Sequence, residues 1–257
     1  MSRPPALLAP LALLALAGCA RGRDTPSVDR SDGRIPELRV PWVPAGTMQI
    51  DGALGEGEWS SAGHIEGFVA PGNGRSVRAY RANAEAWVAW SDEGLLVAFR
   101  VLDGAPRSYV APGERDPHIW ERSTGVELML QPGDRADNRD YFELQYGLGG
   151  ARWSTRFDDY NRPVTRGPDG VTRYGHEDWE PDDLHRVELI PSRGAYAVEL
   201  LLRWSSFDRP PPSPGDVWRA NLYAFRDGQR EATAWSPTLG QGNFHRASRF
   251  GRLRFAR

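Results

Sequence analysis

Two glutamates in this sequence, Glu127 and Glu143, have the residue type needed for general acid–base chemistry. Each lies in a segment whose alternating residues predict a β-strand, 125–131 and 141–146. Glycoside hydrolases use two carboxyl groups that lie about 5–10 Å apart in space, a distance that a sequence alone cannot exclude. The simpler interpretation is two solvated strand carboxylates, and we prefer it. Glycan hydrolysis or lysis with this pair remains an alternative.

Other catalytic patterns are absent from the sequence. It contains no G-x-S-x-G, no H-E-x-x-H, no phosphate-binding loop and no dinucleotide-binding glycine fingerprint. There is no lysine to form a Schiff base, and the five histidines are dispersed without metal-ligand spacing. We therefore expect a non-catalytic protein without a cofactor.

An acidic loop at 133–140 is the candidate metal site. Hard cations such as calcium bind several carboxylate and carbonyl oxygens. The spacing in the loop is not that of an EF-hand, and Arg135 and Arg139 interrupt it. We expect a charged loop that balances its own ions, with calcium as the alternative. The candidate ligands are Asp134, Asp137, Asn138 and Asp140.

The first nineteen residues predict export. Arg3 precedes a run of Ala, Leu and Pro from Ala6 to Ala17, which is shorter than the roughly 20 apolar residues that span a bilayer. The run ends in Leu16-Ala17-Gly18-Cys19, which resembles a bacterial lipobox, and Cys19 is the only cysteine. We expect a signal peptide over 1–19, lipid on Cys19 and anchoring in the cell envelope, at the outer membrane rather than the inner one.

The rest of the chain divides into a tether and one domain. Residues 20–41 are polar and lack periodicity, so we expect a flexible tether there and a domain over 42–257. Acidic and basic residues nearly cancel, with a formal net charge of −2, which argues against a nucleic-acid partner. Of the ten tryptophans, most should be buried in a core. We expect a monomer.

Strand patterns dominate the predicted domain. Two of them flank Ser91–Gly94 and predict a hairpin, and in 125–131 Val126, Leu128 and Leu130 share one face. Short helical turns are expected only at 56–61 and 205–208. Many short strands separated by turns predict an all-β, antiparallel β-sandwich of jelly-roll or immunoglobulin-like type. The other predicted strands are 76–82, 85–90, 95–102, 141–146, 152–157, 187–190, 196–204, 218–225 and 250–255.

Four short motifs carry a family resemblance that covers residues 47–255. Ile50-Asp51-Gly52 with Trp59 opens the domain, 95–103 and Trp120 with Val126-Glu127-Leu128 follow, and Phe250-Gly251-Arg252-Leu253 closes it. In this order they resemble the family 9 carbohydrate-binding modules and the wider family-9-like (DOMON-related) group. We interpret Asp51-Gly52 as a tight turn and Phe250-Gly251 as a strand start that needs close backbone approach.

The resemblance implies a β-sandwich that holds a sugar between two aromatic rings. Trp120 matches one ring position, and Phe244 lies near the other, where well-known members carry tryptophan; His245 is the alternative second ring. Glu127 matches a glutamate that accepts hydrogen bonds from sugar hydroxyls. The arginine that the family carries on the following strand is not evident in 141–146.

The sequence thus predicts non-catalytic binding of oligo- or polysaccharide ends by a lipid-anchored protein, linked to polysaccharide capture or catabolism. Besides hydrolysis, two alternatives stay open. One is a haem-binding domain, for which Met48 and Met129 are the only internal methionines. The other is a structural envelope lipoprotein whose sugar site has degenerated.

Overall fold

The computed structural model describes residues 28–257, apart from 56, 78–81, 167–169, 227–230 and 241–242. The predicted signal peptide, Cys19 and the first part of the tether lie outside the described residues. Among the helices in the described ranges, none has the length and apolar character needed to cross a membrane.

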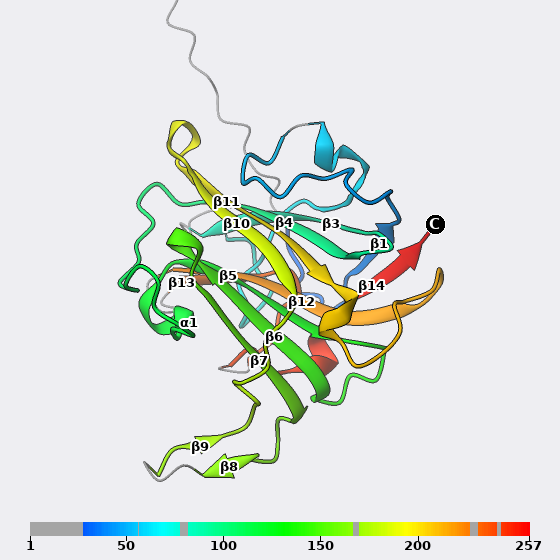
Figure 1. Cartoon of the computed structure of the whole chain (residues 1–257), viewed down its shortest axis with the longest axis vertical. Coiled ribbons are helices and arrows are strands. Elements are labelled where there is room, and N and C mark those ends of the chain that lie inside the picture. The colour runs from blue at the N-terminus through cyan, green and yellow to red at the C-terminus, as the bar shows by residue number, and fades with distance from the viewer. Residues whose placement is uncertain (1–27, 56, 78–81, 167–169, 227–230, 241–242) are drawn as a thin grey trace, which may run out of the picture.

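Two mainly antiparallel sheets pack face to face, as the sequence predicts (Figure 1). The larger sheet has the order β1 (Glu37–Pro41), β14 (Gly251–Ala256), β12 (Val217–Arg226), β5 (Gly125–Gln131), β6 (Arg139–Gly147) and β7 (Arg152–Asp159), with β13 (Glu231–Ala234) also paired to β12. The smaller sheet has the order β10 (Asp183–Ile190), β11 (Ala195–Arg203), β4 (Gly94–Leu102), β3 (Asn83–Trp90) and β2 (Gly63–Ile65).

A two-stranded ribbon and a few short helical turns complete the described structure. The ribbon, β8 (Thr165–Arg166) and β9 (Thr172–Arg173), follows β7 and projects from the sandwich (Figure 1). Helix α1 (Ile119–Arg122) is a single turn before β5. The 3-10 turns are Glu58–Ser61, Leu148–Gly150, Pro191–Arg193, Trp204–Ser206 and Ala247–Arg249.

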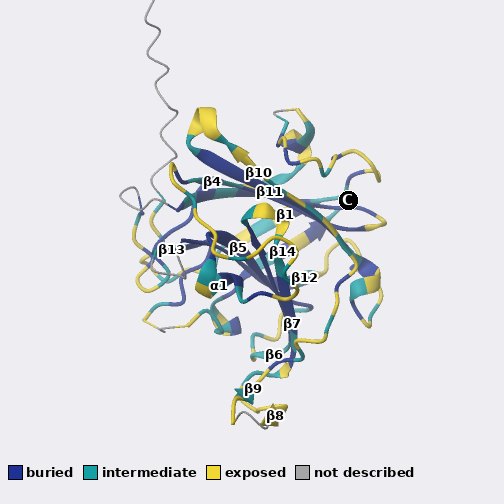
Figure 2. Cartoon of the chain, turned by 60° about the vertical axis from the view of Figure 1, so that its left-hand side comes forward, coloured by how far each residue is buried: buried dark blue, intermediate teal, exposed yellow. Residues whose placement is uncertain are grey.

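The main core lies between the two sheets and follows from strand alternation. Val126, Leu128 and Leu130 of β5 point inward and are almost fully buried among the inward residues of β4 and β11. The outer faces are covered over the central strands as well, and β4, β5, β11 and β12 are buried along most of their length, as the dark strands in Figure 2 show. A second cluster, including Met48 and Trp59, covers the smaller sheet. Two further clusters cover the larger sheet.

The ordered domain starts earlier in the chain than the sequence predicts. Glu37–Pro41, within the range expected to be a tether, forms β1 and pairs in parallel with β14. Val40 of this strand is fully buried in the core. This burial and the pairing with β14 hold the strand, whereas its five residues are too few to show a periodic pattern in the sequence. The strand expected over 76–82 is limited to a bridge at Ser76 in the described residues, and β3 begins at Asn83.

Two motifs of the family resemblance have structural roles. The carboxylate of Glu199, in β11, accepts hydrogen bonds from the backbone N–H groups of Asp51, Gly52 and Leu54 and from the indole of Trp59, at 2.7–3.0 Å. Gly52 has a φ of +88°, which confirms the tight turn. At the other motif, a Cβ on Gly251 would lie 2.5 Å from the Trp235 ring, which confirms the close approach.

Candidate functional site

Strand register builds a polar strip on the outer face of the larger sheet. One row across the sheet places Glu127 opposite Gln145, with Trp153 next to Gln145 on β7. The adjacent row places Met129 opposite Glu143, with Thr155 beyond it. Because side chains alternate along each strand, both rows face away from the core.

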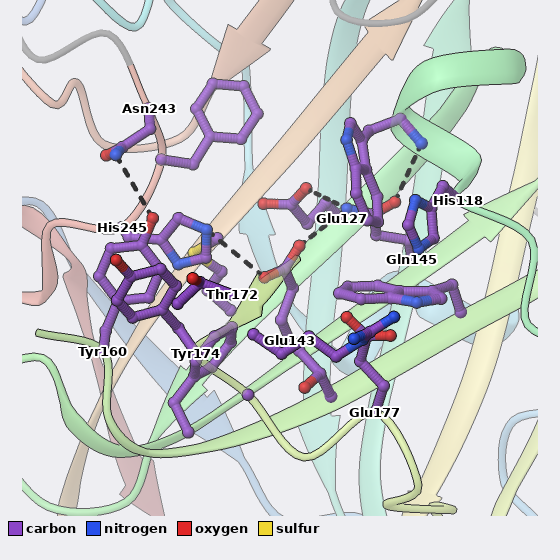
Figure 3. Close-up of a pocket in the computed structure, with 18 of the residues that line it drawn as sticks. His118, Glu127, Glu143, Gln145, Tyr160, Thr172, Tyr174, Glu177, Asn243 and His245 are labelled. Carbon is purple, nitrogen blue, oxygen red and sulfur yellow. Dashed lines mark hydrogen bonds and ion pairs between the residues drawn. The ribbon is translucent and has the colours of Figure 1, made fainter. Parts of the chain in front are cut away.

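The polar strip forms the floor of a cavity of about 400 Å³ between two apolar clusters. Its volume lies within the range of about 300–1,000 Å³ that is typical of small-molecule sites. Figure 3 shows Glu127 and Glu143 in the middle, with Tyr160, Tyr174 and His245 on one side and His118 and Gln145 on the other. The structure therefore brings all four sequence-predicted ligand residues, Trp120, Glu127, Phe244 and His245, to one cavity.

The two carboxyl groups are buried and share one hydrogen-bond donor. The amide nitrogen of Gln145 lies 2.8 Å from Glu127 Oε2 and 2.8 Å from Glu143 Oε1. Its oxygen accepts a hydrogen bond from the backbone N–H of Trp120 at 3.1 Å, which fixes the orientation of the amide. Glu127 and Glu143 are only 1% and 4% exposed, so the interpretation of two solvated strand carboxylates is wrong.

Burial changes the protonation of this pair. Loss of solvation raises the pKa of Glu143 to about 8. Burial and the charge of Glu143 raise the pKa of Glu127 well above its usual range. At neutral pH the pair therefore retains protons. Glu127 Oε1 is buried without a hydrogen-bond partner in the structure, as is the hydroxyl of Thr155 in the same cavity. Such an oxygen is available to a ligand, as a donor while Glu127 is protonated and as an acceptor once it is ionised.

Trp120 is a half-buried ring at the cavity wall. It lies in α1, where its ring stacks on His118 with centroids 4.5 Å apart and meets Trp153 edge-on at 4.5 Å. The stacked histidine covers one face of the indole and holds its orientation.

Phe244 is also a half-buried ring supported from behind. It stacks on Tyr223 with centroids 4.0 Å apart and planes 5° apart. The Tyr223 hydroxyl donates to the Phe244 carbonyl at 3.1 Å. Both rings that the family resemblance assigns to sugar stacking are thus wall residues of the cavity, each with one face already covered by the protein.

His245 supports the cavity wall more than it offers a ring face. It stacks on Tyr160 at 3.9 Å, and its Nδ1 lies 2.7 Å from the Tyr141 hydroxyl. Burial lowers the pKa of His245 to about 3, so the imidazole is neutral at physiological pH. Burial also raises the pKa of Tyr141, whose hydroxyl therefore stays protonated. The other ring nitrogen of His245, Nε2, lies 3.7 Å from Glu143.

The acidic loop at 133–140 positions the His245 segment. The side chain of Asn138 donates to the His245 carbonyl at 3.0 Å and accepts from the Ala247 N–H at 2.6 Å. The loop carboxylates are engaged elsewhere: Asp134 with Arg219 and Arg252, Asp137 with Gln131, and Asp140 with Arg209. In the described ranges no group of three His, Cys, Asp or Glu is arranged to hold a metal ion.

Sequence reasoning missed several residues of the cavity. Gln145 alternates with core residues along β6, and Trp153 and Thr155 alternate along the neighbouring β7, so strand periodicity could have placed them beside the carboxylates. Tyr160 and Tyr174 lie before and after the short β8–β9 ribbon, where the sequence carries no periodic signal. The two internal methionines are not brought together, because Met129 lines this cavity and Met48 covers the opposite sheet.

Comparison with solved structures identifies the fold. A family 9 carbohydrate-binding module from Caldicellulosiruptor kristjanssonii in complex with cellotriose matches with a TM-score of 0.57 and 16% identity, over 85% of this chain and 93% of that chain. The same kind of module in complex with glucose matches with a TM-score of 0.55 and 17% identity, over 84% and 95%. A "putative carbohydrate-binding protein" from Bacteroides uniformis matches with a TM-score of 0.63 and 16% identity, over 86% and 100%.

No family model matches the sequence, and no curated protein matches it significantly. The likeness is therefore one of fold. The chain is an all-β sandwich with the fold of the family 9 carbohydrate-binding modules, which confirms the resemblance drawn from its motifs.

Proposed function

We propose that the cavity on the larger sheet binds a carbohydrate without breaking a bond in it. A sugar ring presents apolar C–H faces and a rim of hydroxyl groups. Trp120 and Phe244 offer aromatic surface for the faces, and Glu127 Oε1 is a buried carboxyl oxygen without a partner, free to bond a sugar hydroxyl. That unpartnered oxygen inside an aromatic-walled cavity is the observation that carries the proposal, because buried polar atoms are normally satisfied.

The binding modules with the same fold that hold cellotriose and glucose support this proposal. A site of this kind, with ring contacts and a few hydrogen bonds, gives a Kd in the micromolar to millimolar range, about −4 to −8 kcal/mol. The cavity volume favours the end of an oligosaccharide or polysaccharide as the occupant.

Calorimetric titration of the purified protein with cellobiose and other oligosaccharides tests the proposal. Trp120→Ala should weaken binding at least about tenfold, the equivalent of about 1.4 kcal/mol. Trp87 provides a matched control because it is also half-buried and also stacks on a histidine, His64, at 4.7 Å, but on the opposite sheet. Unchanged sugar affinity in a folded Trp120→Ala variant would show that this cavity is not the binding site.

Glycan hydrolysis is the second candidate, and the burial of Glu127 and Glu143 in one cavity favours it. Both carboxyls contact the same amide nitrogen, so they are close enough for acid–base chemistry, and each has a raised pKa. Turnover of defined oligosaccharides that is abolished by Glu127→Gln would establish catalysis. Binding without turnover would contradict hydrolysis and leave carbohydrate binding as the proposed function.

We also propose that the protein acts at the cell envelope, held by lipid on Cys19 at the outer membrane. A tethered site raises the local concentration of captured fragments, which suits a role in polysaccharide catabolism. The sequence pattern at 16–19 supports this proposal. Palmitate labelling that disappears in Cys19→Ser is the expected result, whereas an unlabelled protein in the soluble fraction would contradict it.

A further inference from the structure

The floor of the cavity carries acidic groups without a nearby cation. Glu127 and Glu143 are buried, and the charge of Glu177 at the rim further raises the pKa of Glu143. Among the residues that the structure describes, no arginine lies within ion-pair distance of either buried carboxyl. The basic group nearest to Glu143 is His245, which is neutral.

The groups around the pair come from several elements, and one of them, Arg173, carries a fixed positive charge beyond ion-pair distance of both carboxyls. Tyr223 on β12 and Tyr141 on β6 are buried phenols that remain protonated because burial raises the pKa of each. Tyr160 belongs to the wall after β7, and burial raises the pKa of its phenol too. His118 and Arg173 also line the cavity, from the α1 side and from the ribbon.

We propose that this cavity selects a sugar bearing a protonated amine, such as a glucosamine unit, over the neutral sugar of the same shape. The inference rests on the proposed carbohydrate binding and names the class of sugar. Once Glu127 has released its proton, its buried and unpartnered Oε1 is the acceptor for the ammonium group, and Thr155 is a second polar group in the same cavity. The folded protein has already buried the carboxyls, so the ligand need not organise them.

Aromatic walls complete an environment suited to a cation. Trp120, Trp153 and Phe244 line the same cavity as the carboxyls, together with Tyr160 and Tyr174. Ring faces attract an ammonium group within about 6 Å, and an apolar surrounding strengthens its attraction to a carboxylate. A hydroxyl at the same position would gain a hydrogen bond but not the charge interaction.

Three β-1,4-linked disaccharides that differ at C2 test the inference. The glucosamine dimer carries amines, N,N′-diacetylchitobiose carries neutral acetamides, and cellobiose carries hydroxyls. At pH 6.5 and low salt, we expect the glucosamine dimer to bind at least tenfold more tightly than either neutral sugar. Its binding should also release protons from the carboxyl pair, which calorimetry in two buffers of different ionisation enthalpy measures, whereas cellobiose should release none.

Glu127→Gln removes the proposed acceptor of the ammonium group and keeps its shape, because its amide oxygen can still accept from Gln145. The folded variant should lose the preference for the amine over cellobiose. Glu85→Gln, a carboxylate paired with Arg100 on the opposite sheet, is the matched control and should keep the preference. Folding is checked by near-ultraviolet circular dichroism, and the comparison of ligands on the unmodified protein does not depend on any variant.

The possible outcomes are distinct. Equal affinity of the unmodified protein for the amine and for cellobiose would overturn the selectivity but leave the proposed carbohydrate binding intact. Absence of binding for all three sugars, together with silence on a wider glycan array, would overturn the proposed function itself. Proton release with the amine and its loss in Glu127→Gln would support the inference.

Discussion

Glu143 should make the protein less stable as pH rises above neutrality. An unfolded glutamate ionises near its model value of 4.5, whereas the folded Glu143 has its pKa raised to about 8. Between these values the native state binds the proton that the unfolded state has lost. The free energy of unfolding therefore falls with increasing pH across this window, and the whole contribution of Glu143 is lost once pH exceeds about 8.

The size of the effect follows from the pKa difference. One pKa unit corresponds to about 1.36 kcal/mol, so Glu143 alone removes about 2 kcal/mol of stability between pH 6.5 and pH 8.5. Glu127 changes stability in the same direction, since burial raises its pKa too. His245 affects stability at lower pH. Its folded pKa is lowered to about 3, so the stability that the neutral imidazole contributes is lost as pH falls from 6.5 toward 3. Above pH 6.5 the histidine is neutral in both states.

Denaturant unfolding at pH 6.5 and pH 8.5 measures the effect. Between pH 6.5 and pH 8.5 the unmodified protein should lose about 2 kcal/mol more stability than Glu143→Gln, because the amide of the variant does not ionise. Glu85→Gln is the control and should retain the full dependence. A protein whose stability is the same at the two pH values, or a Glu143→Gln variant with an unchanged slope, would refute the assignment of a raised pKa to this carboxyl.

Three further substitutions test the supports of the site. Gly251→Ala places a methyl group against the Trp235 ring and should cost about 1–3 kcal/mol in a thermal or denaturant melt, as overpacking does. Glu199→Leu leaves four N–H donors, three of them buried, without an acceptor and should cost at least about 3 kcal/mol, measured the same way. Asn138→Ala releases the segment that carries the second ring, and should weaken sugar binding severalfold by calorimetry while it lowers stability by about 1–2 kcal/mol.

Strand alternation predicted much of the fold because it is a local property. The pattern in 125–131 gave β5 with its bounds and its inward face, and the hairpin around Ser91–Gly94 joins β3 to β4. The two 3-10 turns near 56–61 and 205–208 lie at or within a residue or two of the expected positions. The predicted start of the ordered domain was wrong because the five residues of β1 are held by pairing with β14, which is distant in the sequence.

The site was predicted in part for a similar reason. The family motif pointed to Trp120 and Glu127, which the structure brings to one cavity, and alternation put Glu143 on a strand. Burial of the outer face could not be deduced, because the covering segments around 160–177 and 243–249 have no period of their own. The sequence therefore suggested solvated carboxylates where the folded chain buries them.

The energetic cost of the acid pair argues that it serves a ligand. An outer sheet face that is merely covered would be more stable with neutral side chains, since buried carboxyls without a cation are costly. Functional sites are where proteins tolerate such local conflicts. Replacing Glu127 and Glu143 together by glutamine should then raise stability at pH 8.5 and abolish the preference for an amine. A double variant that is less stable at pH 8.5 yet binds the three disaccharides as before would show that the pair serves folding instead.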